Sequence, residues 1–222
     1  MEQTEDSLTR GEAMRTKSVK VLMAALVVLA VSFGCSSSDG GVQTPTNPGT
    51  PTPTVSTAGL SAAAVAQIND PYSTFRETIR RWADRNTPVR VYGGPYDVAV
   101  VQAAADRWST AGAPIQFLAV SSESIAELVV ANENPLVEGG CASTDLSGSP
   151  AFLGGKIRIG IGVKPGCDGG LNLALTHNFG HAMGLGHGGG VMEERVSSFD
   201  ILPHHIEVLN WSYKAPVGAE VR

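Results

Sequence analysis

Residues 176–192, THNFGHAMGLGHGGGVM, carry the most informative pattern in this sequence. His177 and His181 lie one helical turn apart on a predicted helix that begins near Leu171. Both imidazoles therefore lie on one face of that helix, about 40° apart around its axis. Two neutral imidazoles placed in this way make half of a zinc site.

A third histidine follows at a spacing that lets the chain turn back. Gly184 can adopt a positive φ and end the helix, so that His187 returns as a third nitrogen ligand. The chain has five histidines, and three of them occupy this spacing. This favours a metal site over the alternative of structural histidines that bind no ion. His204 and His205 show no such pattern, and we expect them at the solvated start of a helix.

This pattern resembles that of the metzincin zinc peptidases, in particular their matrixin-like bacterial members. The family motif is His-Glu-x-x-His-x-x-Gly-x-x-His followed by a Met-turn. The residues that match are His177, His181, Gly184 and His187, with Met192 at the position of the Met-turn. The resemblance covers residues 88–213 and implies a Zn²⁺ ion held by the three histidines.

The resemblance also implies a fold class and a ligand. The fold is expected to be α+β, a small mixed twisted sheet with an active-site helix and a C-terminal helix at residues 199–213. A cleft along an edge strand is expected to take an extended peptide or protein. The reaction of the family is hydrolysis of a peptide bond by zinc-activated water.

One departure from the family lies at the second position of the motif, where a glutamate acts as general base and this chain has Asn178. In these enzymes zinc lowers the pKa of its bound water, and the carboxylate takes the proton and passes it to the leaving amine. A neutral amide can hold a water molecule but cannot accept its proton. General acid–base catalysis contributes about 10²- to 10⁴-fold, so we expect severely reduced hydrolysis with metal binding retained.

A second departure is the short link at residues 188–190, since family members usually have a longer link and often a Tyr after the Met. Met192 is therefore open to two interpretations, a Met-turn or an ordinary core methionine. Glu193 and Glu194 follow it, and we expect both at the solvated surface. The alternative is that one of them replaces the missing base.

The sequence pattern of the remaining folded residues predicts a sheet backed by helices. Residues 58–87 are expected to form a helical N-terminal segment, because Phe75, Ile79 and Trp82 recur at helical spacing. The metallopeptidase-like domain follows over residues 88–222. Its expected elements are a strand at 89–92, a helix at 97–109, and strands at 115–120, 128–131 and 156–163. This order fits a small mixed sheet better than a sandwich or a bundle.

The N-terminus has the outline of a secretory signal. Residues 22–33 form an apolar run that follows basic residues and falls short of the roughly 20 residues that span a bilayer. Residues 32–35 resemble a bacterial lipobox, which implies lipidation of Cys35 and a signal over residues 1–35. A departure at the first lipobox position leaves simple secretion open. Acidic residues ahead of Met14 predict that translation starts at Met14.

Residues 36–57 are rich in Ser, Thr, Pro and Gly and predict a disordered, solvated tether. A lipid anchor followed by such a spacer predicts an extracytoplasmic protein, either a lipoprotein at the bacterial cell envelope or a secreted protein. In an oxidising compartment Cys141 and Cys167 are expected to form a disulfide, with free buried thiols as the alternative.

Charge and composition limit the partners. The formal charge is −5 and the pI is about 5.5, so the chain lacks the basic surface of a nucleic-acid binder. We expect a monomer whose only contact with a membrane is the lipid anchor. Two functional hypotheses follow: a zinc metallopeptidase impaired by Asn178, in effect a pseudoenzyme, or a non-catalytic zinc-containing lipoprotein that binds a peptide or protein.

Overall fold

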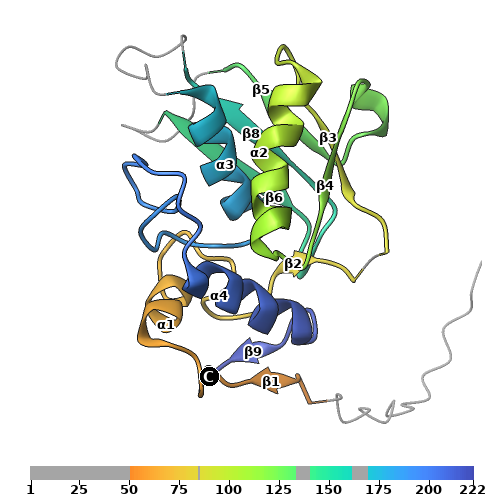
Figure 1. Cartoon of the computed structure of the whole chain (residues 1–222). Helices are drawn as coiled ribbons and strands as arrows, with labels where there is room; N and C mark the ends of the chain where they lie inside the picture. Colours follow the sequence, from red (N-terminus) through yellow and green to blue (C-terminus); the bar gives the residue numbers. More distant parts are fainter. Residues whose placement is uncertain (1–50, 85, 134–140, 162–169) are drawn as a thin grey trace, which may run out of the picture. The chain divides into compact units, whose positions relative to one another are not determined.

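The fold is α+β, as predicted, and is organised around a mixed five-stranded sheet (Figure 1). The computed structural model describes residues 51–84, 86–133, 141–161 and 170–222. The strand order is β4-β3-β5-β8-β6, and every neighbouring pair is parallel except β6 and β8. The strands are β3 (Val89–Tyr92), β4 (Phe117–Val120), β5 (Leu128–Ala131), β6 (Ala142–Ser147) and β8 (Gly154–Ile159).

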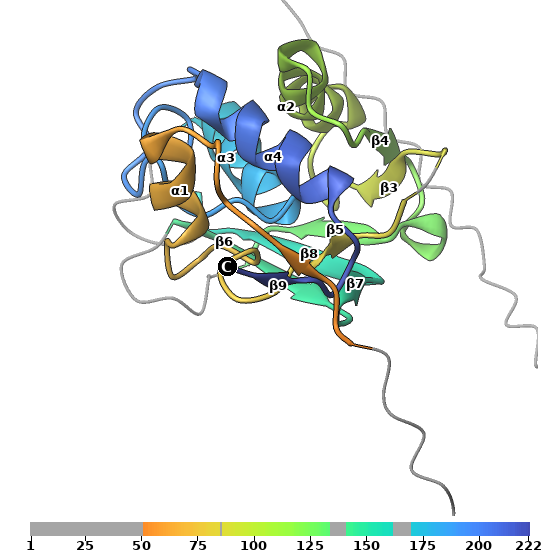
Figure 2. The same ribbon diagram turned by 90° about the horizontal axis from the view of Figure 1, so that it is seen from below.

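Helices α2 (Val98–Ala111) and α3 (Leu171–Ala182) cover one face of this sheet (Figure 2). The side chain of Asp97 caps the N-terminus of α2, and Gly112 ends the helix with φ of 96°. Between helices and sheet, alternate strand residues are buried, as a sheet with one face on the core requires. These residues are Val89, Val91, Leu128, Val130, Ile157 and Ile159.

The C-terminal helix α4 (Pro203–Lys214) lies beside the short helix α1 (Ala62–Ile68) (Figure 2). It starts four residues later than predicted, because Pro203 occupies its first turn, where a missing N–H costs no helical hydrogen bond. Val208 and Leu209 of α4 are fully buried. The helix therefore supports the core from the side on which the histidine loop lies.

The prediction of a helical segment over residues 58–87 is wrong beyond its first third. Helix α1 ends at Ile68 with Asn69 as its C-cap, and Pro71 follows while the carboxylate of Asp70 accepts a hydrogen bond from the Tyr72 N–H. This turn stops the helix. The apolar residues that suggested a longer helix are buried, as a helix would also have placed them. They lie, however, in an irregular segment and in strand β2 (Arg81–Trp82), which pairs in parallel with β7 (Ala151–Phe152). The spacing of these apolar residues therefore reflects their burial and not a helix.

The prediction of a disordered tether over residues 36–57 is wrong for its last residues. Thr54–Val55 forms strand β1, which pairs in parallel with β9 (Glu220–Val221). The indole N–H of Trp211 also donates to the carbonyl of Ser56 at 3.0 Å. The C-terminal strand thus provides backbone partners that the composition of this segment does not reveal.

Several predictions fall outside the described residues. These are the signal at residues 1–35, the start at Met14, lipidation of Cys35, the tether up to residue 50, and Cys167. Cys141 is disulfide-bonded. No helix within the described ranges is long and apolar enough to cross a membrane.

Candidate metal centre

Helix α3 places the first two histidines as the spacing predicts. The ring centroids of His177 and His181 are 4.6 Å apart. Nδ1 of His177 lies 2.8 Å from the carbonyl oxygen of Val191, and Nδ1 of His181 lies 2.8 Å from that of Leu185. A carbonyl oxygen only accepts, so each Nδ1 carries the proton and each Nε2 carries a lone pair when the ring is neutral.

These two lone pairs face each other. The Nε2 atoms of His177 and His181 are 2.9 Å apart. Burial, together with a smaller effect of the neighbouring rings, lowers the pKa of His177 to about 4 and that of His181 to about 3, so both rings are neutral at pH 7. Two nitrogens bound to one tetrahedral zinc at about 2.0–2.1 Å are about 3.4 Å apart, so the two rings need to separate by about half an ångström to share a zinc ion. A cation between them turns a repulsive contact into a favourable one.

His187 completes the cluster through the predicted turn at Gly184. Gly184 has φ of 107°, and a side chain there would collide with Phe75 and Thr74. The chain therefore ends α3 and returns past its own last turn. Each of His177, His181 and His187 offers one ring nitrogen, and these atoms lie within 4.8 Å of one another. The three predicted ligands are together, in a group that can hold a metal ion.

A clamp from the N-terminal segment, made by Gln67 and Asp70, fixes the loop that carries His187. Oδ1 of Asp70 accepts a hydrogen bond from the backbone N–H of His187 at 3.0 Å and lies 3.9 Å from its Nδ1. The buried amide of Gln67 donates to the carbonyl of Gly186 at 2.9 Å. Side chains at Gly186 or Gly188 would collide with Asp70 and Gln67, respectively. The loop needs these glycines for the clamp to close.

Met192 packs against helix α3 at Gly180, which lies between the first two histidines in sequence. It is fully buried, its N–H donates to the Gly189 carbonyl at 2.9 Å, and its carbonyl accepts from the Gly188 N–H at 3.0 Å. A side chain at Gly180, between the two histidines on α3, would collide with the sulfur of Met192 and the ring of Trp108. The methionine thus packs against the helix at the level of the metal ligands.

His204 and His205 do not form the solvated helix start that we expected. Nε2 of His204 lies 2.7 Å from the carbonyl oxygen of Gly188, next to His187. His205 is fully buried against Trp108, and its Nδ1 accepts the N–H of Leu202 at 3.1 Å. Burial lowers the pKa of His205 to about 4. Both residues hold the loop around the site and lie outside the three-histidine cluster.

Asn178, at the position of the general base, already has protein partners. Its side chain is buried, its Oδ1 accepts from the hydroxyl of Thr144 on β6 at 2.9 Å, and its Nδ2 donates to the carbonyl of Ala174 at 2.8 Å. The amide therefore ties α3 to β6. It contributes no proton acceptor to the site.

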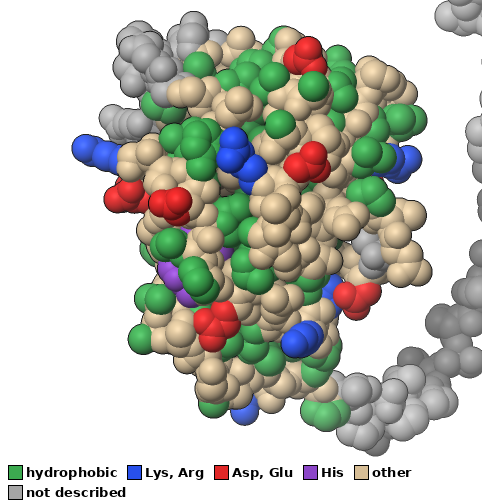
Figure 3. Space-filling model, viewed as in Figure 1, with side chains coloured by type: hydrophobic (Ala, Val, Ile, Leu, Met, Phe, Trp, Pro, Cys, Tyr) green, Lys and Arg blue, Asp and Glu red, His purple; other side chains and the backbone are tan. Residues whose placement is uncertain are grey.

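A cleft of about 700 Å³ opens beside the three histidines. One wall is β6, an edge strand of the sheet that has no further strand partner among the described residues. Glu194 is exposed, as expected, and it also lines this cleft. Figure 3 shows histidine side chains reaching the surface in a small patch, with hydrophobic and carboxylate groups around it.

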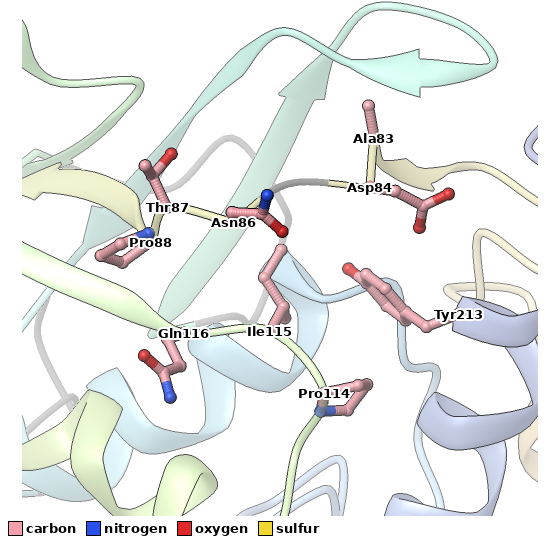
Figure 4. Close-up of a pocket in the computed structure, with 9 residues that line it drawn as sticks. All are labelled: Ala83, Asp84, Asn86, Thr87, Pro88, Pro114, Ile115, Gln116 and Tyr213. Atoms are coloured by element: carbon pink, nitrogen blue, oxygen red, sulfur yellow. The ribbon is translucent and has the colours of Figure 1, made fainter.

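A second cavity, of about 430 Å³, lies between the start of β3, the segment before β4 and the end of α4 (Figure 4). The charged residue among its described lining is Asp84, which pairs with Arg81 at 2.8 Å. Tyr213 extends into this region from α4, and burial raises the pKa of its phenol. No histidine or cysteine is among the described residues that line it, so the group that can hold a metal ion lies at the first cleft.

The site has residues that the sequence reasoning did not single out. Gln67, Asp70 and Thr144 belong to elements far from the motif in sequence, and none carries a recognisable spacing. The Asn-Asp-Pro turn at residues 69–71 is the one available signal, because an Asp before Pro marks a turn and not a helix.

Taken together, two neutral imidazoles with fixed tautomers and a third imidazole within reach form a group that can hold a metal ion, next to a cleft bordered by the edge strand β6. No protein-family model matches this chain, and no curated protein matches it in sequence.

Proposed function

We propose that this protein binds zinc through His177, His181 and His187 in a site of the metzincin type, with peptide-bond hydrolysis impaired by Asn178. The observation that carries the proposal is the pair of unprotonated Nε2 atoms 2.9 Å apart, with a third imidazole within reach. Three imidazole nitrogens suit zinc and leave its fourth position open. Carbonyl partners at Nδ1 are the usual outer contacts of zinc-bound histidines.

The surroundings of the ligands support the same proposal. A glycine with positive φ ends the helix between the second and third histidines, and the buried Met192 packs against the same helix at Gly180. The edge strand β6 borders the cleft, and an extended peptide can add to such an edge by main-chain hydrogen bonds. We therefore propose an extended peptide or protein as the ligand of the cleft.

Zinc bound at this site would supply a Lewis acid and an activated water at neutral pH. The chain's own residues provide little for the proton transfers that peptide hydrolysis needs. Asn178 is neutral and engaged with Thr144 and Ala174. Glu194 brings a carboxylate to the same cleft, but it is solvent-exposed.

A second candidate function is a non-catalytic zinc protein that holds a peptide or protein. The engagement of Asn178 favours it, because an amide whose two polar atoms bind Thr144 and Ala174 has a structural role. The expected location is the cell envelope or the extracellular space, with attachment through Cys35 as a further part of the proposal.

Metal analysis of purified protein tests the zinc site. We expect about one zinc per chain, with loss of that zinc in His181→Ala and retention in His204→Gln, since His204 bonds a backbone carbonyl and lies outside the cluster. Equal zinc content in wild type and His181→Ala would refute the site.

A peptidase assay of wild type beside Asn178→Glu separates the two functions. An impaired peptidase should show weak hydrolysis that rises by about 10²-fold or more in Asn178→Glu. A protein with no hydrolysis in either form, but with zinc and peptide binding intact, has the binding function. Equal hydrolysis by both forms would show that the missing base is not the limiting feature.

A further inference from the structure

Arg80 is a cation in the cleft whose hydrogen-bonding capacity is largely unused. Its side chain lines the cleft beside the three histidines. Among the residues that the structure describes, its guanidinium makes one hydrogen bond, from Nη2 to the carbonyl of Gly148 at 3.3 Å, and its Nε is buried without a partner there. No carboxylate in the described part of the chain forms an ion pair with it. A guanidinium carries five N–H donors, so most of them remain for a ligand.

The neighbouring Arg81 shows what a structural arginine looks like in this fold. It is buried, and its guanidinium donates to the carbonyls of Trp82, Ser212 and Ala215 and to the carboxylate of Asp84. Four of its five guanidinium N–H groups are thus bonded within the protein. Arg80 differs from it by facing the cleft and by lacking an acidic partner.

The position of Arg80 is fixed on two sides. Its guanidinium carbon lies 6.0 Å from the centre of the Phe152 ring, which also lines the cleft. Its backbone carbonyl accepts the hydroxyl of Thr74 at 2.8 Å, and the same hydroxyl lies 3.3 Å from the carbonyl of Gly184, in the turn between His181 and His187. The arginine is therefore connected through Thr74 to the ligand loop.

The other charges of the cleft leave Arg80 available. Asp145 on β6 pairs with Arg158, which removes it as a partner. Glu194 and Arg195 are exposed at the rim, on the segment that follows Met192. An anionic group that enters the cleft thus meets a fixed guanidinium backed by an aromatic ring, which is a favourable setting for a carboxylate.

We propose that the cleft binds peptides that carry an acidic side chain and that Arg80 recognises this carboxylate; the proposal rests on the peptide-binding role of the cleft given above. The contact of Arg80 with Gly148 lies past the end of β6, four residues beyond Thr144. At about 3.3 Å per residue this is about 13 Å along the strand. The acidic residue therefore lies about four residues along the peptide from the position opposite Thr144, and so apart from the metal.

The test uses rhodamine-labelled ten-residue peptides of Ala, Ser and Leu that carry one Glu, placed at each position in turn, with the matching Gln peptides as controls. Anisotropy titrations measure their affinity for the full chain, with and without one equivalent of zinc. We expect one or two neighbouring Glu positions to bind about five- to tenfold more tightly than their Gln counterparts. Raising the salt concentration should shrink this ratio.

The variants assign the effect to one side chain. In Arg80→Gln the ratio of Glu to Gln affinity should fall to about one, while Arg80→Lys keeps part of it because the charge remains. Arg76→Gln, an exposed arginine of the same segment that does not line the cleft, should keep the full ratio. A ratio that survives Arg80→Gln, that is lost instead in Arg195→Gln, or that is absent in the wild type would overturn the proposal.

Zinc content measured on the same samples keeps this inference separate from the proposed function. Acid preference without zinc binding would refute the metal site and support the role of Arg80. Zinc binding without acid preference would refute the role of Arg80 and leave the metal site standing.

Discussion

The carboxylate of Asp70 accepts a 3.0 Å hydrogen bond from the backbone N–H of His187, across 117 positions of sequence. The same oxygen accepts the N–H of Tyr72 at 2.9 Å, which shapes the turn after α1. One carboxylate thus organises both the N-terminal segment and the loop that carries the third histidine.

Removal of this carboxylate should weaken the metal site without destroying it. Asp70→Ala should lower zinc affinity by about tenfold or more, as expected when a group that orients a ligand is lost. Asp70→Asn should lose less, because its side-chain oxygen can still accept both N–H groups. Competition with a chromophoric chelator measures the affinities, and Asp106→Asn, on the exposed side of α2, serves as the control. Unchanged affinity in Asp70→Ala would show that the loop holds His187 unaided.

Substitution of Gly184 should destabilise the fold for two separable reasons. Gly184→Ala combines the strain of φ at 107° with a collision against Phe75 and Thr74. The first costs about 1–2 kcal/mol and the second about 1–3 kcal/mol. Gly59→Ala introduces the backbone strain (φ of 91°) without a collision, because the space around Gly59 is open. Gly170→Ala introduces neither strain nor a collision. Urea unfolding should therefore rank the loss of stability as Gly184→Ala, then Gly59→Ala, then Gly170→Ala.

Lowering the pH should destabilise the metal-free protein already at pH values above those at which carboxylates titrate. Unfolded histidine titrates near 6.5, whereas the folded rings of His177 and His205 stay neutral down to about pH 4 and that of His181 to about pH 3. Between these values the unfolded state binds more protons, so the free energy of unfolding falls as the pH falls. The slope is at most about 1.4 kcal/mol per pH unit for each ring.

Urea titrations in the presence of a chelator at pH 7.0, 6.0 and 5.0 measure this loss. Replacing His181 by Asn removes one buried titrating ring and should flatten the profile. A free energy of unfolding that stays constant from pH 7.0 to 5.0 would contradict the burial of neutral rings.

The hydrogen bond between Asn178 and Thr144 should give a measurable coupling energy in the free energy of unfolding. Thr144→Val leaves Oδ1 of a buried amide without its donor and should cost about 1–3 kcal/mol of stability. In an Asn178→Leu background the same change should cost much less, because the acceptor is gone. A double-mutant cycle by urea unfolding gives the coupling, and additive effects would show that the hydrogen bond contributes nothing.

The sequence predicted the features that depend on local spacing. Helix α3 starts at Leu171 as predicted, and the three histidines converge because a helical turn and a glycine with positive φ are both encoded within eleven residues. Strands at residues 89–92 and 128–131 have the predicted bounds, since short β-branched runs between turns leave few alternatives.

Prediction from the sequence failed where a segment gets its packing or hydrogen-bond partner from a distant part of the chain. Strand β6, the wall of the cleft, has the sequence ASTDLS at residues 142–147, which lacks β-branched apolar residues and is a strand because β8 pairs with it. The spacing of Phe75 and Ile79 suggested a helix, but both are buried by contacts from irregular chain. The clamp on His187 likewise depends on contacts that no local pattern encodes.

The pairing of β1 with β9 couples the local stability of the first and last residues that the structure describes. The N–H of Arg222 donates to the carbonyl of Val55, and that of Thr57 donates to the carbonyl of Arg222. Fraying of either end therefore breaks hydrogen bonds of the other, and amide protons of both should exchange with solvent in a single opening event. A bulky fusion after Arg222 would sit beside strand β1, near the first residues that the structure describes (Figure 1).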